Sequence, residues 1–129
     1  MVHAVIDLLG ALGIESGQKD LALLNWALDE AENYAKYELN IFGDTLHELE
    51  APLASLSAGE YLKAKRALEP EAFENLDLTP AIKRIEVGDT NTEFVSDSVQ
   101  SAEQRFDLLT EYLIKSGKSK LQGYRRLKW

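Results

Sequence analysis

The 129-residue sequence contains no cysteine. Disulfide bonds, thiolate zinc sites and thiol catalysis are therefore excluded. A long hydrophobic run is also missing: Asp7 and Gly10 interrupt the apolar residues from Val5 to Leu12, and no other run approaches the ~20 residues of a membrane span. No basic segment opens the chain, so we expect neither a signal peptide nor a membrane span, and an intracellular setting is the default expectation.

Acidic residues are absent from Tyr112 to Trp129, where six basic residues stand. Residues 1–111 hold all 22 acidic and eight of the 14 basic residues, a formal charge of −14 in a chain of net charge −8. So acidic a body argues against a dedicated nucleic-acid binder, because phosphate binding needs a basic footprint. The two parts are predicted to contact different surfaces, for instance with the tail of one copy on the body of the next.

Motifs of enzymes are missing as well. His47-Glu48-Leu49-Glu50 opens like a zinc-protease motif, but Ala51 stands where the second histidine belongs. No Gly-x-Ser-x-Gly elbow occurs, and Gly117-Lys118-Ser119 lacks the earlier glycine and the strand of a phosphate-binding loop. We therefore predict no enzymatic activity, no metal site and no cofactor.

Apolar spacing predicts three helices before residue 70. A short one covers 5–14, with Gly13 as its C-terminal stop. The clearest runs from Gln18 to Leu39, where apolar residues recur every three or four positions: Leu21, Leu24, Leu28, Ala31, Ala35 and Leu39. Trp26, Tyr34 and Tyr37 lie beside this stripe, where aromatic residues pack or contact a partner, and Asn40 suits the helix end.

The second long helix is predicted from Pro52 to Leu68 and ends at Pro70. Gly59 and two serines weaken it, and its apolar positions are Leu53, Leu56, Tyr61, Leu62, Ala64 and Leu68. A final helix begins near Ser96–Ser98 and is expected to end at about Ser116, with Gly117 as the residue that stops it. Its apolar stripe consists of Ala102, Phe106, Leu109 and Leu113.

The period changes to two after residue 81, which predicts a β-hairpin at about 82–95 with its turn at Gly88-Asp89. A lone hairpin is only marginally stable in water, so we expect it to pair with another subunit. The residues predicted to make this inter-subunit contact are Ile85, Val87, Gly88, Asp89 and Phe94.

The predicted fold is thus mostly α: a small bundle of two long amphipathic helices and a C-terminal helix, with an inserted hairpin and an extended C-terminal tail. It divides into a helical domain at 1–117 and a basic, aromatic tail at 118–129.

This tail can be interpreted as a solvated end, as a nucleic-acid contact or as a docking segment. The acidic body opposes the second interpretation. Large apolar groups gain free energy only when buried, and here they interleave with cations, which favours docking on a protein. The predicted docking residues are Leu121, Tyr124, Arg125, Arg126, Leu127, Lys128 and Trp129.

Three segments together resemble the small head–tail connector (adaptor, or head-completion) proteins of long-tailed bacteriophages. The opening from Ile6 to Leu24 is similar to the family's N-terminal pair of helices. The segment from Ile82 to Phe94 is similar to its alternating strand around Gly-Asp. The ending from Leu121 to Trp129 is similar to its closing Tyr-Arg-Arg string.

The resemblance implies a structural virion protein at the head–tail interface, assembled in the host cytoplasm. Such proteins form a ring, typically of twelve copies, beneath the portal protein and meet a stopper or tail-completion protein. DNA passes through their channel without sequence-specific binding, and an acidic wall suits that passage. The alternative is a small bacterial adaptor or regulatory protein that binds one partner through its tail.

Overall fold

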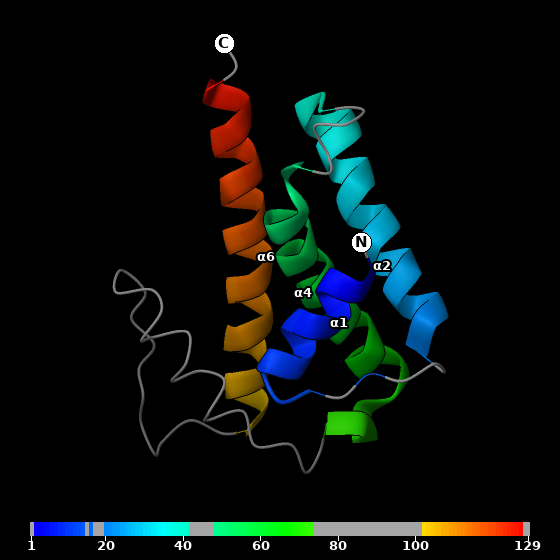
Figure 1. Ribbon diagram of the computed structural model, residues 1–129. Helices are drawn as coiled ribbons and strands as arrows, with labels where there is room; N and C mark the ends of the chain where they lie inside the picture. Colours follow the sequence, from blue (N-terminus) through cyan, green and yellow to red (C-terminus); the bar gives the residue numbers. More distant parts are fainter. Residues whose placement is uncertain (1, 15, 17–19, 42–47, 74–101, 128–129) are drawn as a thin grey trace.

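The computed structural model describes residues 2–14, 16, 20–41, 48–73 and 102–127 (Figure 1). Every element in these ranges is helical, which confirms the prediction of a mostly helical chain. The elements are α1 (Val2–Ala11), α2 (Leu21–Asn33), the π-helical turn η2 (Tyr34–Glu38), α4 (Glu50–Leu68), the 3-10 turn η3 (Pro70–Phe73) and α6 (Ala102–Leu127). The predicted hairpin at about 82–95 lies outside the described residues.

Helix α4 is the centre of the bundle. It packs against α6, α2 and α1, and Figure 1 shows α2 and α6 on opposite sides of it with α1 across its front. Small residues make this central position possible: Ala54, Ser57, Ala58 and Gly59 are all buried and let neighbouring helices approach closely. The glycine and serines that weaken α4 in the sequence are therefore contact positions, and Ser57 Oγ also donates a 2.6 Å hydrogen bond to the Leu53 carbonyl.

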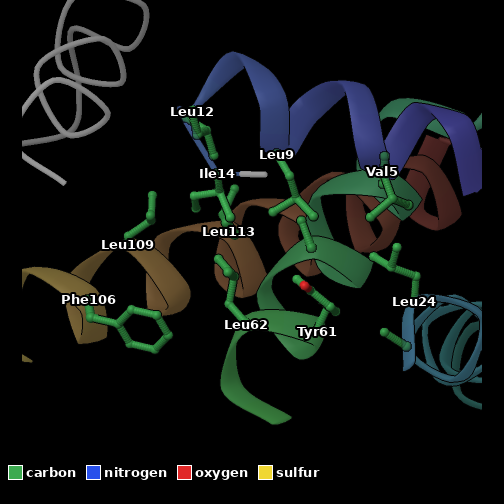
Figure 2. Close-up of a cluster of buried hydrophobic side chains, with 13 residues drawn as sticks. Val5, Leu9, Leu12, Ile14, Leu24, Tyr61, Leu62, Phe106, Leu109 and Leu113 are labelled. Carbon is green, nitrogen blue, oxygen red and sulfur yellow. The ribbon is translucent and has the colours of Figure 1, made fainter. Parts of the chain in front are cut away.

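Two apolar clusters form the core. The larger joins all four α-helices, and Figure 2 shows Tyr61 and Leu62 of α4 between Leu24 of α2 and Leu109 and Leu113 of α6. The smaller lies toward the other end of α4. Its buried members are Ala31, Ala35, Leu39, Ile41, Leu49, Leu53, Leu56 and Leu121.

Two helix ends follow their sequence signals. After α1, Gly13 has a φ of 81°, and its N–H donates to the Gly10 carbonyl while the Ile14 N–H donates to that of Leu9. This is a Schellman end, so the prediction for Gly13 is confirmed. After η2, Asn40 has a φ of 56°, a left-handed conformation that asparagine tolerates, and it ends the second helix as predicted.

The predicted end of the last helix at Ser116 is wrong, because α6 continues to Leu127. Gly117 lies inside the helix, where it allows α6 to approach α4. A Cβ there would lie 2.8 Å from the Leu56 nitrogen and 2.8 Å from the Pro52 oxygen. The glycine that suggested a helix end therefore marks a close contact between two helices. The tail that was expected to be extended is helical as far as Leu127.

Candidate functional site

The predicted docking segment occupies the last turns of α6, and the structure separates its residues into different roles. Leu121 is 0% exposed and packs in the smaller core cluster with Leu53 and Leu56. Its side chain is covered by this chain's own helices, so in this structure it is a core residue that anchors α6. Its neighbour in the apolar pattern, Tyr124, is half-buried against the same cluster.

The remaining predicted docking residues lie at or beyond the C-terminal end of α6. The backbone of Arg125, Arg126 and Leu127 forms its last turn. Lys128 and Trp129 lie outside the described residues, as do the five predicted hairpin residues Ile85, Val87, Gly88, Asp89 and Phe94.

The C-terminal half of α6 is held against the end of the second helix by Tyr34, the first residue of η2. Gln122 Nε2 donates a 2.9 Å hydrogen bond to the Tyr34 hydroxyl, and Lys118 Nζ lies 5.0 Å from the centre of its ring. Both contacts come from the segment that was predicted to be an extended docking tail. They hold its first residues against the second helix.

The exposed charges of α6 change sign along the helix. Glu103, Asp107 and Glu111 are exposed in its first half, and Lys115 and Lys120 in its second. This order complements the helix dipole, because anions are favoured near the N-terminus of a helix and cations near its C-terminus. The basic surface expected from the sequence is thus a helical one.

The second exposed feature is a pair of aromatic residues on the other side of the bundle. The side chain of Trp26 on α2 is 44% exposed and that of Tyr37 on η2 is 74% exposed. The sequence left open whether these aromatics pack or face a partner. The structure shows that Tyr34 contacts α6, whereas Trp26 and Tyr37 face solvent.

A buried ionic group, formed by Lys65 with Asp20 and Glu69, lies near the start of α2 and was not predicted from the sequence. Lys65 of α4 is 6% exposed, and its Nζ lies 2.6 Å from Asp20 Oδ1 and 2.8 Å from Glu69 Oε2. The available signal was its position, since Lys65 follows Tyr61 and Leu62 at core spacing. Leu68, which was predicted to be an apolar contact of this helix, is instead 71% exposed.

The chemistry of this group favours a structural role. Hydrogen bonds to Asp20 and Glu69 raise the pKa of Lys65, so its ammonium stays protonated at neutral pH. Burial, and then the Asp20 charge, raises the pKa of Tyr61 to about 12. The Tyr61 hydroxyl is fully buried, and an interaction with the Asp20 carboxylate adds to the rise of its pKa. Neither side chain therefore offers a nucleophile or a base near pH 7.

Arg66 joins α4 to the start of α6. Its guanidinium donates to Glu103 at 2.7 Å and to Asp107 at 2.6 Å, and it lies 4.8 Å from the centre of the Phe106 ring. Phe106 also meets Phe73 of η3, with ring centres 5.1 Å apart. These contacts anchor the N-terminal end of α6, as Leu121 and Tyr34 anchor its other half.

Comparison with protein-family models, with curated proteins and with solved structures gives no match. In the described part of the chain, no helix is long and apolar enough to cross a membrane. Within the same residues, no group of three or more metal-ligating side chains is placed to hold an ion. Within the described residues, the chain is a helical bundle that exposes lysines on α6 and two aromatic side chains on α2 and η2.

Proposed function

We propose that this chain is a structural protein of a long-tailed bacteriophage, which forms a ring beneath the portal and joins the head to the tail. It acts by protein–protein docking and has no catalytic role. The ring extends the DNA channel, and its acidic surface lets DNA pass without being held. In the virion it lies at the head–tail interface, between the portal and a stopper or tail-completion protein.

The observation that carries this proposal is the placement of the closing string that resembles the connector ending. Leu121 fixes α6 in the core, and Tyr124 still touches that core. Arg125 and Arg126 follow directly after Tyr124 on the last helical turn. A basic, aromatic end on a rigid helix is suited to docking, because little conformational freedom is lost on binding.

The test is reconstitution with the portal protein of the phage that encodes this chain. The full chain is expected to form rings visible by electron microscopy and to bind the purified portal. A chain that ends at Gln122 keeps Leu121 and therefore its core, but loses the string from Gly123 to Trp129. It should remain folded by circular dichroism and fail to bind the portal.

Two matched controls define the outcome. The double substitution R125E/R126E keeps the full length and should also abolish portal binding, whereas K63E, at an exposed position of α4, should not. A full chain that neither forms rings nor binds the portal contradicts the proposal. If the gene instead lies away from portal, terminase and capsid genes and the chain captures one host protein through its C-terminal end, the adaptor function replaces it.

A further inference from the structure

The exposed side of α2 and η2 carries two aromatic side chains that nothing in the described chain covers. Trp26 and Tyr37 are 44% and 74% exposed, and their spacing of about three helical turns places them along one side. The opposite side of α2 packs on α4 through its buried residues Leu24, Ala27, Leu28 and Ala31. Large exposed aromatics along one helix side are typical of a protein interface.

The surroundings of these aromatics select for a cationic partner. Asp29 and Glu30 are exposed on α2, between Trp26 and Tyr37 in sequence. Glu32 is half-buried, and its Oε2 lies 4.0 Å from Lys36 Nζ. Aromatic rings attract cations through their faces, and nearby carboxylates add to that attraction. An acidic, aromatic helix side therefore suits lysine and arginine side chains.

The chain itself shows that α6 supplies such cations to this helix. Lys118 lies 5.0 Å from the centre of the Tyr34 ring, and Gln122 donates to the hydroxyl of the same residue. Lys115 and Lys120, on either side of Lys118 in sequence, are exposed and carry no ion pair within the described residues. Five residues apart on an α-helix, they lie about 140° from each other around α6, so each by itself is available to a second acidic surface.

We propose that the outer side of α2 in one copy, centred on Trp26 and Tyr37, binds the C-terminal half of α6 in a second copy. Figure 1 shows α2 and α6 on opposite sides of α4. The contact is heterologous, and repeated contacts of this kind close into a ring or extend into a filament. The proposal rests on the proposed function, since it names the interface between subunits of that ring.

The experiment is charge reversal followed by mixing, with sedimentation velocity of the full chain at low and high salt. D29K/E30K reverses the α2 surface, and K115E/K120E reverses the α6 surface. Each variant alone should associate about tenfold more weakly than the wild type, because like charges then meet. An equimolar mixture of the two should recover assembly, since every contact between unlike copies again joins opposite charges.

The controls separate this interface from general charge effects. D7K/E71K changes the net charge by the same amount as D29K/E30K at exposed positions off α2 and α6, and should leave association unchanged. W26A should weaken it without altering the circular dichroism spectrum. The proposal is overturned if the wild type stays monomeric up to about 1 mM. It is also overturned if the charge reversals weaken association no more than the control variant does, or if mixing the two reversed variants fails to restore assembly.

Failure of this interface and failure of the connector function give different results. Self-association through α2 and α6 without any portal binding keeps the interface and removes the connector role. Portal binding and ring formation that D29K/E30K and W26A leave intact keep the connector role and remove the interface.

Discussion

Replacement of Gly117 by alanine is expected to destabilise the protein, although alanine is the better helix former. The new Cβ would lie 2.8 Å from the Leu56 nitrogen, 2.8 Å from the Pro52 oxygen and 2.9 Å from the Leu56 Cβ. Two of these atoms belong to the backbone, so no side-chain rotation relieves the contact and α6 must move away from α4. Overpacking of this kind costs roughly 1–3 kcal/mol.

The expected loss is smaller than the packing cost, because glycine inside a helix is itself unfavourable. Alanine in its place gains about 1 kcal/mol of helix propensity. The net expectation for G117A is therefore a loss of up to about 2 kcal/mol in the free energy of unfolding. For a chain of this size, the upper end corresponds to a fall of up to about 8 °C in Tm.

Gly123 is the matched control, because it lies in the same helix and a Cβ there meets nothing within 4 Å. G123A should gain about 0.5–1 kcal/mol, the propensity term alone. Urea denaturation followed by circular dichroism measures both changes. If G117A gains as much stability as G123A does, the close contact is refuted. If G123A has no effect, the helix does not extend through Gly123.

Three further changes test the buried and half-buried polar groups. Y61F removes a buried hydroxyl that interacts with the Asp20 carboxylate, so it should change the free energy of unfolding by no more than about 1 kcal/mol. The pKa of Tyr61 rises from 10.0 in the unfolded chain to about 12 in the folded one, so its contribution to the free energy of unfolding is complete below pH 10 and is lost as the pH rises through 12. The Tm of Y61F should therefore fall less than that of the wild type between pH 10 and pH 12. If the Tm of both proteins falls equally over that range, the raised pKa is contradicted. K65A leaves the Asp20 carboxylate buried without its cation, and a loss of about 3–5 kcal/mol in urea is expected, whereas D20N/K65M should recover most of it. R66A should cost about 1 kcal/mol at low salt and less in 1 M NaCl, and salt-independent loss would show that packing on Phe106 dominates.

The sequence predicted the helices best where one stripe repeats without interruption. Leu24, Leu28, Ala31 and Ala35 recur along the second helix and are buried as predicted. Leu21, the first residue of that predicted stripe, is 36% exposed. It is the first residue of α2 and lies near the edge of the packed region. Periodicity identifies a helix and its buried side, but it does not show where along the helix the neighbour begins.

The candidate site was predicted less well, because its residues depend on what α6 meets. Leu121, Tyr124 and the cations form one pattern in the sequence, which suggested one docking segment. The structure assigns Leu121 to the core and Lys118 to Tyr34, and leaves Lys115 and Lys120 exposed. Burial of a side chain depends on contacts that are distant in sequence, such as Leu121 with Leu53, and no local pattern encodes them.

By itself, the sequence determined that the chain is helical, that Gly13 and Asn40 end two helices, and that charge is divided between an acidic body and a basic end. These properties follow from local conformational preferences and from composition. Only the tertiary structure decided that Gly117 is a contact between α6 and α4 and that Lys65 lies in the core. Both depend on how closely two helices approach, and that distance is set by the side chains of both partners.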